Sequence, residues 1–437
     1  MSTTDLLARW SNLSWEEIEA ELETGPEESV TEFFGPESAA ELSALAEPVA
    51  FHGQKEAVIL LPGMMGSLLS SIRGVTGLVW INPKVILQGN SDFLTLNREG
   101  TGDGHPMVEM VATGAEKITY LRMALSLRRE CQLYEFPYDW RRPIGFNGKL
   151  LGRFIERWAD EDDSMQFTLV GHSMGGLVSR SYVAQMPDHA RKRVKRVVML
   201  GTPHFGAAGA VADIMKGNRI MALAKALNRG NDVRKVVMNM PSAYELLPAP
   251  RDLFPASRPY PVNWDLYDAR EWRLQGVRQD YLDAGKRFHE LLADHDHPVE
   301  MVEIAGCHQD TIVDVHRSFG ADEKPRLDVI RQDEGPDSGD ATVPLYSAIL
   351  PGARIYYMEE VHRYLARNKK IIQATLDLIY DREPDLPTQL PEPEKGLLSF
   401  APAGPVSVEE EAADLRERIE SGTLSEQDLD KFYFIGA

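Results

Sequence analysis

The sequence predicts an α/β fold in which a mostly parallel sheet carries helices on both faces. First, short apolar, β-branched segments alternate with segments of helical period between residues 57 and 200. Second, this alternation implies right-handed crossovers, which make neighbouring strands parallel. Third, polar motifs follow directly after several of the expected strands, at the edge of the sheet where the functional side chains of such folds lie.

The charge of the chain is concentrated at its two ends. The 437 residues carry a net charge of −20; residues 1–50 hold twelve acidic residues against one basic residue, and residues 381–437 hold fourteen against five. Residues 51–380 are therefore neutral as a whole. This pattern argues against nucleic-acid binding, which needs a basic face. The basic run at 191–196 lies between an expected helix and an expected strand, and we interpret it as a solvated turn.

Composition divides the chain into three parts. Residues 1–50 predict an acidic N-terminal extension of two or three short helices. Residues 51–380 predict the α/β domain, with a loop-rich lid at 73–115 and a helical cap inserted at about 207–298. Residues 381–437 predict a Pro-rich linker and an acidic C-terminal helical tail.

The roles of the two ends remain open from the sequence. The N-terminal extension suits a cover packed on the body, a weakly ordered segment or a binding arm. In the tail, Phe432, Tyr433 and Phe434 stand in an otherwise charged segment. Aromatic side chains there predict docking, either onto the body or onto a protein partner.

The elements of the central domain follow from their local patterns. The clearest expected strand, AVILL at 57–61, is a short run of Val, Ile and Leu, as buried parallel strands are. Each expected helix has an apolar stripe, such as Leu151, Ile155 and Trp158. The expected strands are 57–61, 132–136, 167–170, 194–200, 299–305 and 353–358, and the expected helices are 115–129, 149–159, 177–185 and 364–380.

The segment 166–176, QFTLVGHSMGG, predicts a nucleophile at Ser173. An apolar strand enters a Gly-x-Ser-x-Gly turn, and a helix leaves it. A hydroxyl becomes an effective nucleophile when such a turn exposes it beside a base and a helix N-terminus. Gly171 and Gly175 remove the side chains that would collide in so sharp a turn.

Two backbone N–H groups are expected to form an oxyanion hole. One belongs to Met174, the residue after the nucleophile, and the other to Met64, in the loop PGMMGS that follows the first strand. A plain turn after that strand remains the alternative reading for Met64.

Asp340 and His362 complete the predicted triad with Ser173. Each follows an expected strand, and the chain order Ser, Asp, His is the order found in hydrolases that carry this type of turn. His362 would act as general base and Asp340 would orient it. We considered Asp337, Glu359 and Glu360 as competing acids, and His204 as a competing base, and we favour Asp340 and His362.

Several other features favour structural interpretations. Asp139 and Arg141, two residues apart in a loop, predict an ion pair, and the alternating Asp294 to His297 run does not predict a metal site. We expect no metal and no cofactor. Four methionines in the cap segment are expected to be core residues, with an adaptable acyl pocket as the alternative. They are Met215, Met221, Met238 and Met240.

The remaining sequence features indicate the compartment. Cys131 and Cys307 stand in or beside apolar runs and are expected to be buried free thiols, as in a reducing compartment. The first residues lack the cationic start and apolar core of a signal peptide. The longest apolar stretch, 57–72, is broken by Pro62, Gly63 and Gly66 and is no membrane span. We expect a cytoplasmic protein without an integral membrane segment.

Seven stretches together resemble the lecithin:cholesterol acyltransferase family of α/β-hydrolases, over about residues 55–380. The resemblance implies the α/β-hydrolase fold, a triad at Ser173, Asp340 and His362, and an oxyanion hole at the amides of Met64 and Met174. The stretches are LLPGMMGS at 60–67, PYDWRRP at 137–143, LVGHSMGG at 169–176, LGTPHFGA at 200–207, PSAYELLP at 241–248, GDATVPLYS at 339–347 and VHRYL at 361–365.

Because members of this family cleave or transfer acyl groups of glycerolipids, the resemblance implies a small-molecule or lipid ester substrate. The leading hypothesis is a serine hydrolase, an esterase or lipase, that forms an acyl-enzyme on Ser173. One alternative is an acyltransferase that passes the acyl group to an alcohol. Another is a hydrolase-type effector module that reaches a protein partner through its acidic tails.

Overall fold

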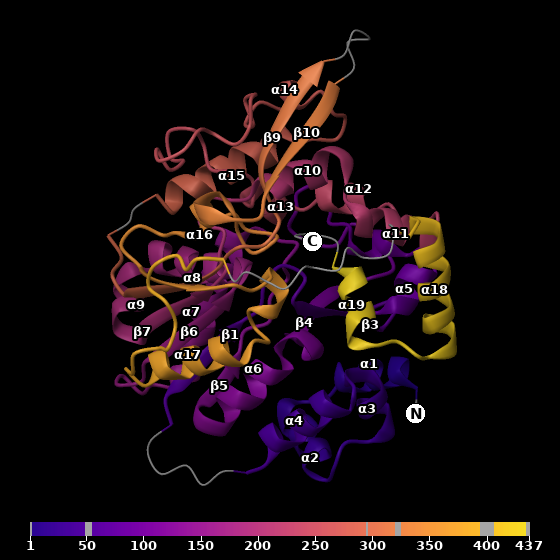
Figure 1. Cartoon of the computed structure of the whole chain (residues 1–437), viewed down its shortest axis with the longest axis vertical. Coiled ribbons are helices and arrows are strands. Elements are labelled where there is room, and N and C mark those ends of the chain that lie inside the picture. Colours follow the sequence, from indigo (N-terminus) through magenta and orange to yellow (C-terminus); the bar gives the residue numbers. More distant parts are fainter. Residues whose placement is uncertain (1, 49–54, 294–295, 320–324, 394–405, 434–437) are drawn as a thin grey trace.

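The computed structural model describes residues 2–48, 55–293, 296–319, 325–393 and 406–433. Its centre is a sheet of six strands in the order β11-β8-β7-β6-β1-β5, and every neighbouring pair is parallel (Figure 1). The strands are β1 (Ala57–Leu61), β5 (Gln132–Glu135), β6 (Phe167–His172), β7 (Val194–Leu200), β8 (Glu300–Gly306) and β11 (Arg354–Met358).

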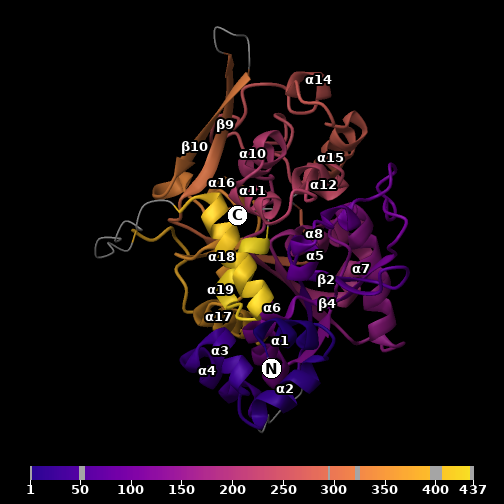
Figure 2. The same cartoon turned by 90° about the vertical axis from the view of Figure 1, so that its right-hand side faces the viewer.

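Helices cover both faces of this sheet, as Figures 1 and 2 show. On one face α7 packs on α8, and α8 contacts the central strands β1, β6 and β7. On the other face α6 contacts β5, and α17 contacts both α6 and β7. The predicted α/β fold is confirmed. The helices are α6 (Lys117–Glu130), α7 (Ile144–Ala159), α8 (Met174–Gln185), α9 (Pro187–Arg193) and α17 (Lys369–Ile379).

Two helices differ from the expected bounds for local reasons. Helix α7 begins at Ile144 and not at Lys149, because Pro143 precedes its first turn and Asn147 and Gly148 continue the helix. Helix α17 begins at Lys369, because the side chain of Asn368 accepts hydrogen bonds from the first N–H groups and so caps it. A separate 3-10 turn, η3 (His362–Tyr364), precedes that cap.

The segment expected to be a loop-rich lid contains regular structure. Strand β2 (Ser67–Ser71) pairs antiparallel with β3 (Gly77–Trp80) and β4 (Met110–Ala115) in a small sheet. A helix α5 (Pro83–Leu87) and a 3-10 turn η1 (Ser91–Leu94) follow β3.

Six helices lie within the described residues 208–291, where a helical cap was expected, with a long irregular segment between residues 246 and 268. The four methionines assigned to this part belong to the core: Met240 is fully buried, Met221 and Met238 are buried, and the partly buried Met215 packs on the same core. The helices are α10 (Ala208–Lys216), α11 (Arg219–Leu227), α12 (Val233–Met238), α13 (Pro241–Glu245), α14 (Ala269–Trp272) and α15 (Gln279–Leu291).

A hairpin that the sequence analysis did not assign rises from the sheet at the top of Figure 1. It consists of β9 (Thr311–Phe319) and β10 (Pro325–Gln332), which pair antiparallel. The alternation of β-branched and polar residues in TIVDVHRSF is the signal that could have predicted it. A 3-10 turn η2 (Gly335–Asp337) and a short helix α16 (Leu345–Ala348) follow the hairpin.

The N-terminal extension forms four helices and covers part of the body. Helices α2 and α4 contact α6, and the guanidinium of Arg128 in α6 lies 2.8 Å from carboxylate oxygens of both Glu16 and Glu19. The packed cover is therefore the arrangement found for residues 2–46. The helices are α1 (Thr3–Trp10), α2 (Trp15–Glu23), α3 (Glu28–Phe34) and α4 (Pro36–Ala46).

The described part of the C-terminal tail also lies on the body. It forms α18 (Val408–Ser421), α19 (Glu426–Leu429) and a 3-10 turn η4 (Asp430–Phe432), and α18 contacts α11 and α5. Both the N–H and the hydroxyl of Thr3 donate to the carbonyl oxygen of Gly422, each at 2.9 Å. The start of α1 and the end of α18 are therefore joined directly.

Candidate active site

Ser173 lies in a strained turn between β6, which ends at His172, and α8, which begins at Met174. Its φ of 54° and ψ of −123° are unusual for a residue with a side chain. Its N–H donates to the carbonyl of Leu200 at 2.8 Å, which fixes the turn to the neighbouring strand. The serine hydroxyl therefore projects from the carboxyl edge of the sheet.

Glycine is required on both sides of Ser173, at 171 and 175, because backbone atoms of other residues lie very close to both positions. A Cβ on Gly175 would lie 2.3 Å from the carbonyl oxygen of Leu61, and a Cβ on Gly171 would lie 2.6 Å from the nitrogen of Gly176. These distances are shorter than any real contact of a Cβ atom. The turn that exposes Ser173 can close only with glycine at both positions.

His362 and Asp340 lie in direct contact. The Nδ1 atom of His362 is 2.6 Å from Oδ2 of Asp340, and the His362 N–H donates to the Asp340 backbone carbonyl at 2.7 Å. The other carboxylate oxygen accepts from the N–H groups of Thr342 at 3.0 Å and Val343 at 2.6 Å. Asp340 is only 1% exposed, so these donors replace the water around its charge.

The competing acids lie in other surroundings. The Asp337 side chain is 62% exposed, and its nearest cation is Arg258 at 4.0 Å. Glu360 accepts from the N–H of Val361 and the amide of Asn368. Of the predicted acids with described partners, Asp340 is therefore the one that contacts His362.

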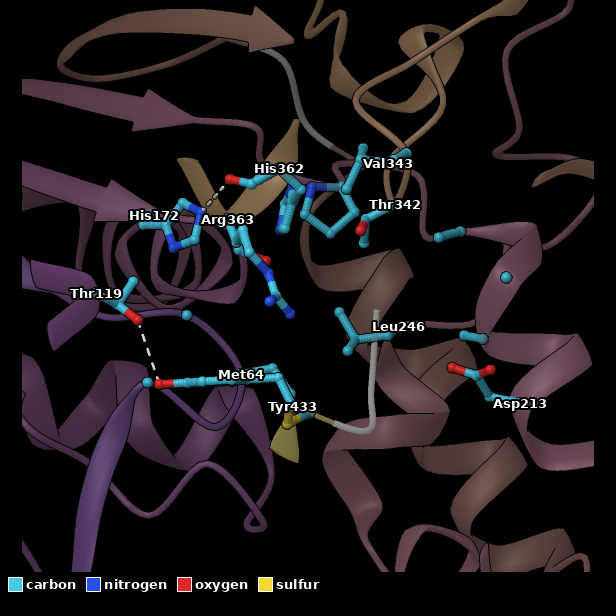
Figure 3. A pocket seen from close by; sticks show the side chains of 18 of the residues that line it. Met64, Thr119, His172, Asp213, Leu246, Thr342, Val343, His362, Arg363 and Tyr433 are labelled. Atoms are coloured by element: carbon cyan, nitrogen blue, oxygen red, sulfur yellow. Dashed lines mark hydrogen bonds between the residues drawn. The ribbon is translucent and has the colours of Figure 1, made fainter. Parts of the chain in front are cut away.

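Ser173 and His362 line one pocket. Figure 3 shows this pocket with His362 among the side chains around it. Apolar groups make much of its wall, from the start of α10, from the end of α13 and from β9; among them are Ala207, Ala210, Leu246, Ile312 and Val343. An apolar hollow beside a hydroxyl and an imidazole suits the acyl part of an ester.

Of the two residues predicted to form an oxyanion hole, Met64 lines this pocket and Met174 directly follows Ser173. The residue before Met64, Gly63, approaches the nucleophile so closely that a Cβ there would lie 3.0 Å from Cβ of Ser173. Met174 is the first residue of α8, where N–H groups have no partner inside the helix. The loop after β1 and the start of α8 thus meet beside Ser173.

His204, the competing base, is part of a different cluster. Its Nε2 lies 3.2 Å from Oε2 of Glu303, and Arg180 donates to its Nδ1 at 3.3 Å. All three side chains are buried, and burial raises the pKa of Glu303 well above its ordinary value and lowers the pKa of Arg180 to about 10. His204 does not line the pocket of Ser173, so it supports the fold there.

The structure contains the ion pair predicted in the loop of Asp139 and Arg141, and the two cysteines predicted to be buried thiols. Arg141 is 1% exposed and pairs with Asp139 at 2.8 Å and with Asp103 at 2.9 Å, which confirms the structural interpretation of that loop. Cys131 and Cys307 are buried free cysteines.

Of the run Asp294 to His297, the first two residues lie outside the described ranges, and Nε2 of His297 lies 3.2 Å from the carbonyl of Pro351. Among the described residues, no group of three or more His, Cys, Asp or Glu is arranged to hold a metal ion.

Sequence reasoning missed the contribution of the tail to the pocket. Asp430 and Tyr433 line it, and Asp430 pairs with Arg363, the residue after His362, at 2.7 Å. The Tyr433 hydroxyl donates to Glu116 at 2.8 Å. The aromatic residues of the tail were a signal for docking, and the described contacts are with the body.

Sequence reasoning also missed Tyr120 and His172, which line the pocket beside Met64 and His362. His172 precedes the nucleophile in the Gly-His-Ser-Met-Gly turn, and that position was a signal for a role near the site. Tyr120 carried no signal, because it lies within an apolar helix far from the motif in the chain.

A model of the family described as lecithin:cholesterol acyltransferase matches residues 118–301. This segment includes Ser173 and confirms the family resemblance. It ends before Asp340 and His362. A search of curated proteins found no match.

One solved structure shares the fold over most of the chain, and a lipase structure is similar at a lower score. One protein in a crystal structure of the Tle4-Tli4 complex is 14% identical, with a TM-score of 0.52, over 75% of this chain and 99% of its own. A mature-form lipase, BlEst2 of Bacillus licheniformis, is 13% identical, with a TM-score of 0.40, over 76% of this chain and 96% of its own. The chain has the α/β-hydrolase fold. No described helix has both the length and the apolar character to cross a membrane.

Proposed function

Residues 118–301 match the lecithin:cholesterol acyltransferase family, and we propose that this chain is a serine hydrolase that cleaves carboxylic esters of lipid-like or other acyl substrates. One observation carries the proposal: His362, paired with the buried Asp340 at 2.6 Å, lines the same pocket as Ser173 in its strained turn. These are the groups needed to activate an alcohol as a nucleophile.

In the first half of the reaction Ser173 Oγ attacks the ester carbonyl, while His362 Nε2 takes the hydroxyl proton. The negative charge that develops on the carbonyl oxygen is received by the N–H groups of Met64 and Met174. The bond between the carbonyl carbon and the alcohol oxygen then breaks, and His362 returns the proton to the leaving alcohol. Asp340 holds the imidazole in one tautomer and stabilises its positive charge.

In the second half water attacks the acyl-enzyme, and His362 accepts a proton from it. The bond between the acyl group and Ser173 breaks, the proton returns to Oγ, and a carboxylic acid leaves. No cofactor and no metal enters these steps. The apolar wall of the pocket favours an acyl chain over a charged one.

Ser173→Ala tests this proposal. We expect it to abolish ester hydrolysis and labelling by a fluorophosphonate probe while the melting temperature stays close to that of the wild type. Ser164→Ala is the matched control, because Ser164 is exposed at the far side of the loop before β6. Labelling or hydrolysis that persists in Ser173→Ala would refute the assignment.

Acyl transfer is the second candidate, and the name of the matching family favours it. Here an alcohol replaces water in the second half and becomes esterified. The two are distinguished by product analysis of one acyl ester with and without an added alcohol. If the amount of a new ester rises with the concentration of alcohol, while the amount of substrate ester consumed stays the same, the enzyme is an acyltransferase.

Recruitment of a protein partner through the acidic tails has weaker support. Acidic residues of both tails already pair with cations of the body, such as Glu19 with Arg128 and Asp430 with Arg363. A partner would have to break these contacts. A pull-down with the full chain and with a chain lacking residues 1–50 and 390–437 tests this role, and equal recoveries from both would reject it.

A further inference from the structure

Two buried side chains connect the loop after β1 with His362. The N–H of Gly63 donates to the Tyr120 hydroxyl at 2.7 Å, and that hydroxyl lies 2.9 Å from Nδ1 of His172. The Nε2 of His172 lies 3.0 Å from the backbone carbonyl oxygen of His362, the contact drawn as a dashed line in Figure 3. Tyr120 is 1% exposed and His172 is 5% exposed.

The chemistry of these groups fixes the direction of each hydrogen bond. A carbonyl oxygen only accepts, so the Nε2 of His172 carries a hydrogen and donates it to His362. Burial, with His362 nearby, lowers the pKa of His172 to about 3, so its ring is neutral and its Nδ1 accepts. The Tyr120 hydroxyl therefore donates to Nδ1 and accepts from Gly63.

The connection acts on the backbone of the general base from a second side. The N–H of His362 is held by the Asp340 carbonyl at 2.7 Å, and its carbonyl accepts from His172 and from the N–H of Leu365 at 3.3 Å. Asp340 holds the side chain and the N–H of His362, at the start of the turn η3. His172 holds the carbonyl oxygen of the same residue.

The opposite end of the connection acts on the oxyanion loop. Gly63 directly precedes Met64, and a Cβ on Gly66 would lie 2.7 Å from the Tyr120 hydroxyl, so the loop wraps closely around that oxygen. The same two side chains thus touch the backbone beside the predicted oxyanion donor and the backbone of the predicted base.

We propose that Tyr120 and His172 are positioning residues that set the distance between the general base and the oxyanion loop. The inference rests on the function proposed above. The nucleophile must reach both His362 and the loop that contains Met64. If either of these moved by a small distance, the proton acceptor and the oxyanion donors would no longer be in place at the same time. Neither side chain exchanges a proton with the substrate in this role.

Two substitutions of His172 separate its two contacts. His172→Gln keeps an N–H donor near the place of Nε2, and His172→Asn keeps an acceptor near the place of Nδ1 but cannot reach His362. We expect His172→Asn to lower kcat about 10-fold to 100-fold at unchanged KM. We expect His172→Gln to lose less kcat than His172→Asn, because it keeps the contact with His362 and loses only the contact with Tyr120. Both variants lose the same ring and should melt at similar temperatures.

Tyr120→Phe tests the other end, because it removes the hydroxyl that joins Gly63 to His172 and keeps the ring. We expect a lower kcat at unchanged KM, and an equal decrease in the rate of labelling by a fluorophosphonate, since both reactions form an oxyanion. If circular dichroism shows that the His172 variants do not fold, Tyr120→Phe alone tests the positioning role.

The outcomes separate this inference from the proposed function. If Ser173→Ala remains active, the proposed function fails and the positioning role fails with it. If Ser173→Ala is inactive but Tyr120→Phe or His172→Asn retains the kcat of the wild type, the positioning role alone is wrong. Equal losses in the Gln and Asn variants that follow their melting temperatures would also overturn it.

Discussion

The Asp340 carboxylate is held at both oxygens, one by His362 and the other by the N–H groups of Thr342 and Val343. Asp340→Asn keeps the size of the side chain but places a neutral amide against the imidazole, which favours the wrong tautomer. We expect kcat to fall on the order of 10³-fold to 10⁴-fold, measured with a soluble acyl ester. Asp337→Asn, three residues away, should leave kcat unchanged. Equal losses in both variants would contradict the role of Asp340.

A second residue gives a prediction about stability and pH. Glu245 is 4% exposed, and its carboxylate accepts from the N–H of Ile144. Burial raises its pKa to about 8 from an ordinary value of 4.5, so the folded protein holds a proton that the unfolded chain releases. The stability that this group contributes is complete below pH 4.5 and is lost as the pH rises towards 8.

Glu245→Gln keeps the carbonyl that accepts from Ile144 and cannot ionise. We therefore expect the Tm of the wild type, relative to that of the variant, to fall as the pH rises from about 5 to about 8. Thermal unfolding followed by circular dichroism at several pH values measures the difference. A difference that is independent of pH would show that Glu245 is ionised in the folded protein.

For single residues, the sequence predicts those that stand in a recognisable motif. It does not predict those whose role comes from a contact between distant parts of the chain. Ser173 could be placed because strand, turn and helix signals surround it. Tyr120 and His172 could not, because their role depends on a hydrogen bond between side chains 52 positions apart. Such a pairing leaves no periodic pattern in the chain.

At the scale of elements, the junction of β6 and α8 is limited by space at Gly175. A Cβ there would lie 2.3 Å from the carbonyl oxygen of Leu61 in β1, and backbone atoms cannot move aside cheaply. We expect Gly175→Ala to lower the free energy of unfolding by about 3 kcal/mol or more, measured in urea. Gly209→Ala is the control, because nothing lies within 4 Å of a Cβ there and alanine favours its helix.

The predicted elements were most accurate where burial sets the pattern. Strands β1 and β6 are largely apolar and wholly buried, and the expected bounds of all six strands of the central sheet lie within a few residues of those found. The ends of helices depend on capping side chains such as Asn368. The apolar stripe along a helix does not predict where such a cap lies. The hairpin of β9 and β10 was missed, because it projects from the sheet and carries charged residues on its exposed positions.

At the scale of the whole molecule, the acidic tail is held by cations of the body, including Arg363, which lines the pocket. Asp430 pairs with Arg363 at 2.7 Å and accepts from the hydroxyl of Tyr364 at 3.0 Å, and Glu426 lies 3.2 Å from Arg122. The charge imbalance at this end of the chain predicted a separate tail. It could not predict which arginines receive it, since these lie tens or hundreds of positions away.

Asp430→Ala should therefore loosen the tail from the pocket. It removes the partner of Arg363 and an acceptor of Tyr364, and we expect a loss of about 1–3 kcal/mol in the free energy of unfolding. Glu420→Ala, an exposed position in the same tail, should change it little. Urea unfolding of both variants measures the difference, and equal effects would show that Asp430 contributes no specific contact.

The hydrogen bonds from Thr3 to the Gly422 carbonyl bring the beginning of the chain to the segment that ends at the pocket. A chain without α1 would therefore leave the Gly422 carbonyl, at the end of α18, without both of these donors. The segment that follows Gly422 carries Asp430 and Tyr433 to the pocket, so the two helices and the pocket are linked through one short stretch of the tail.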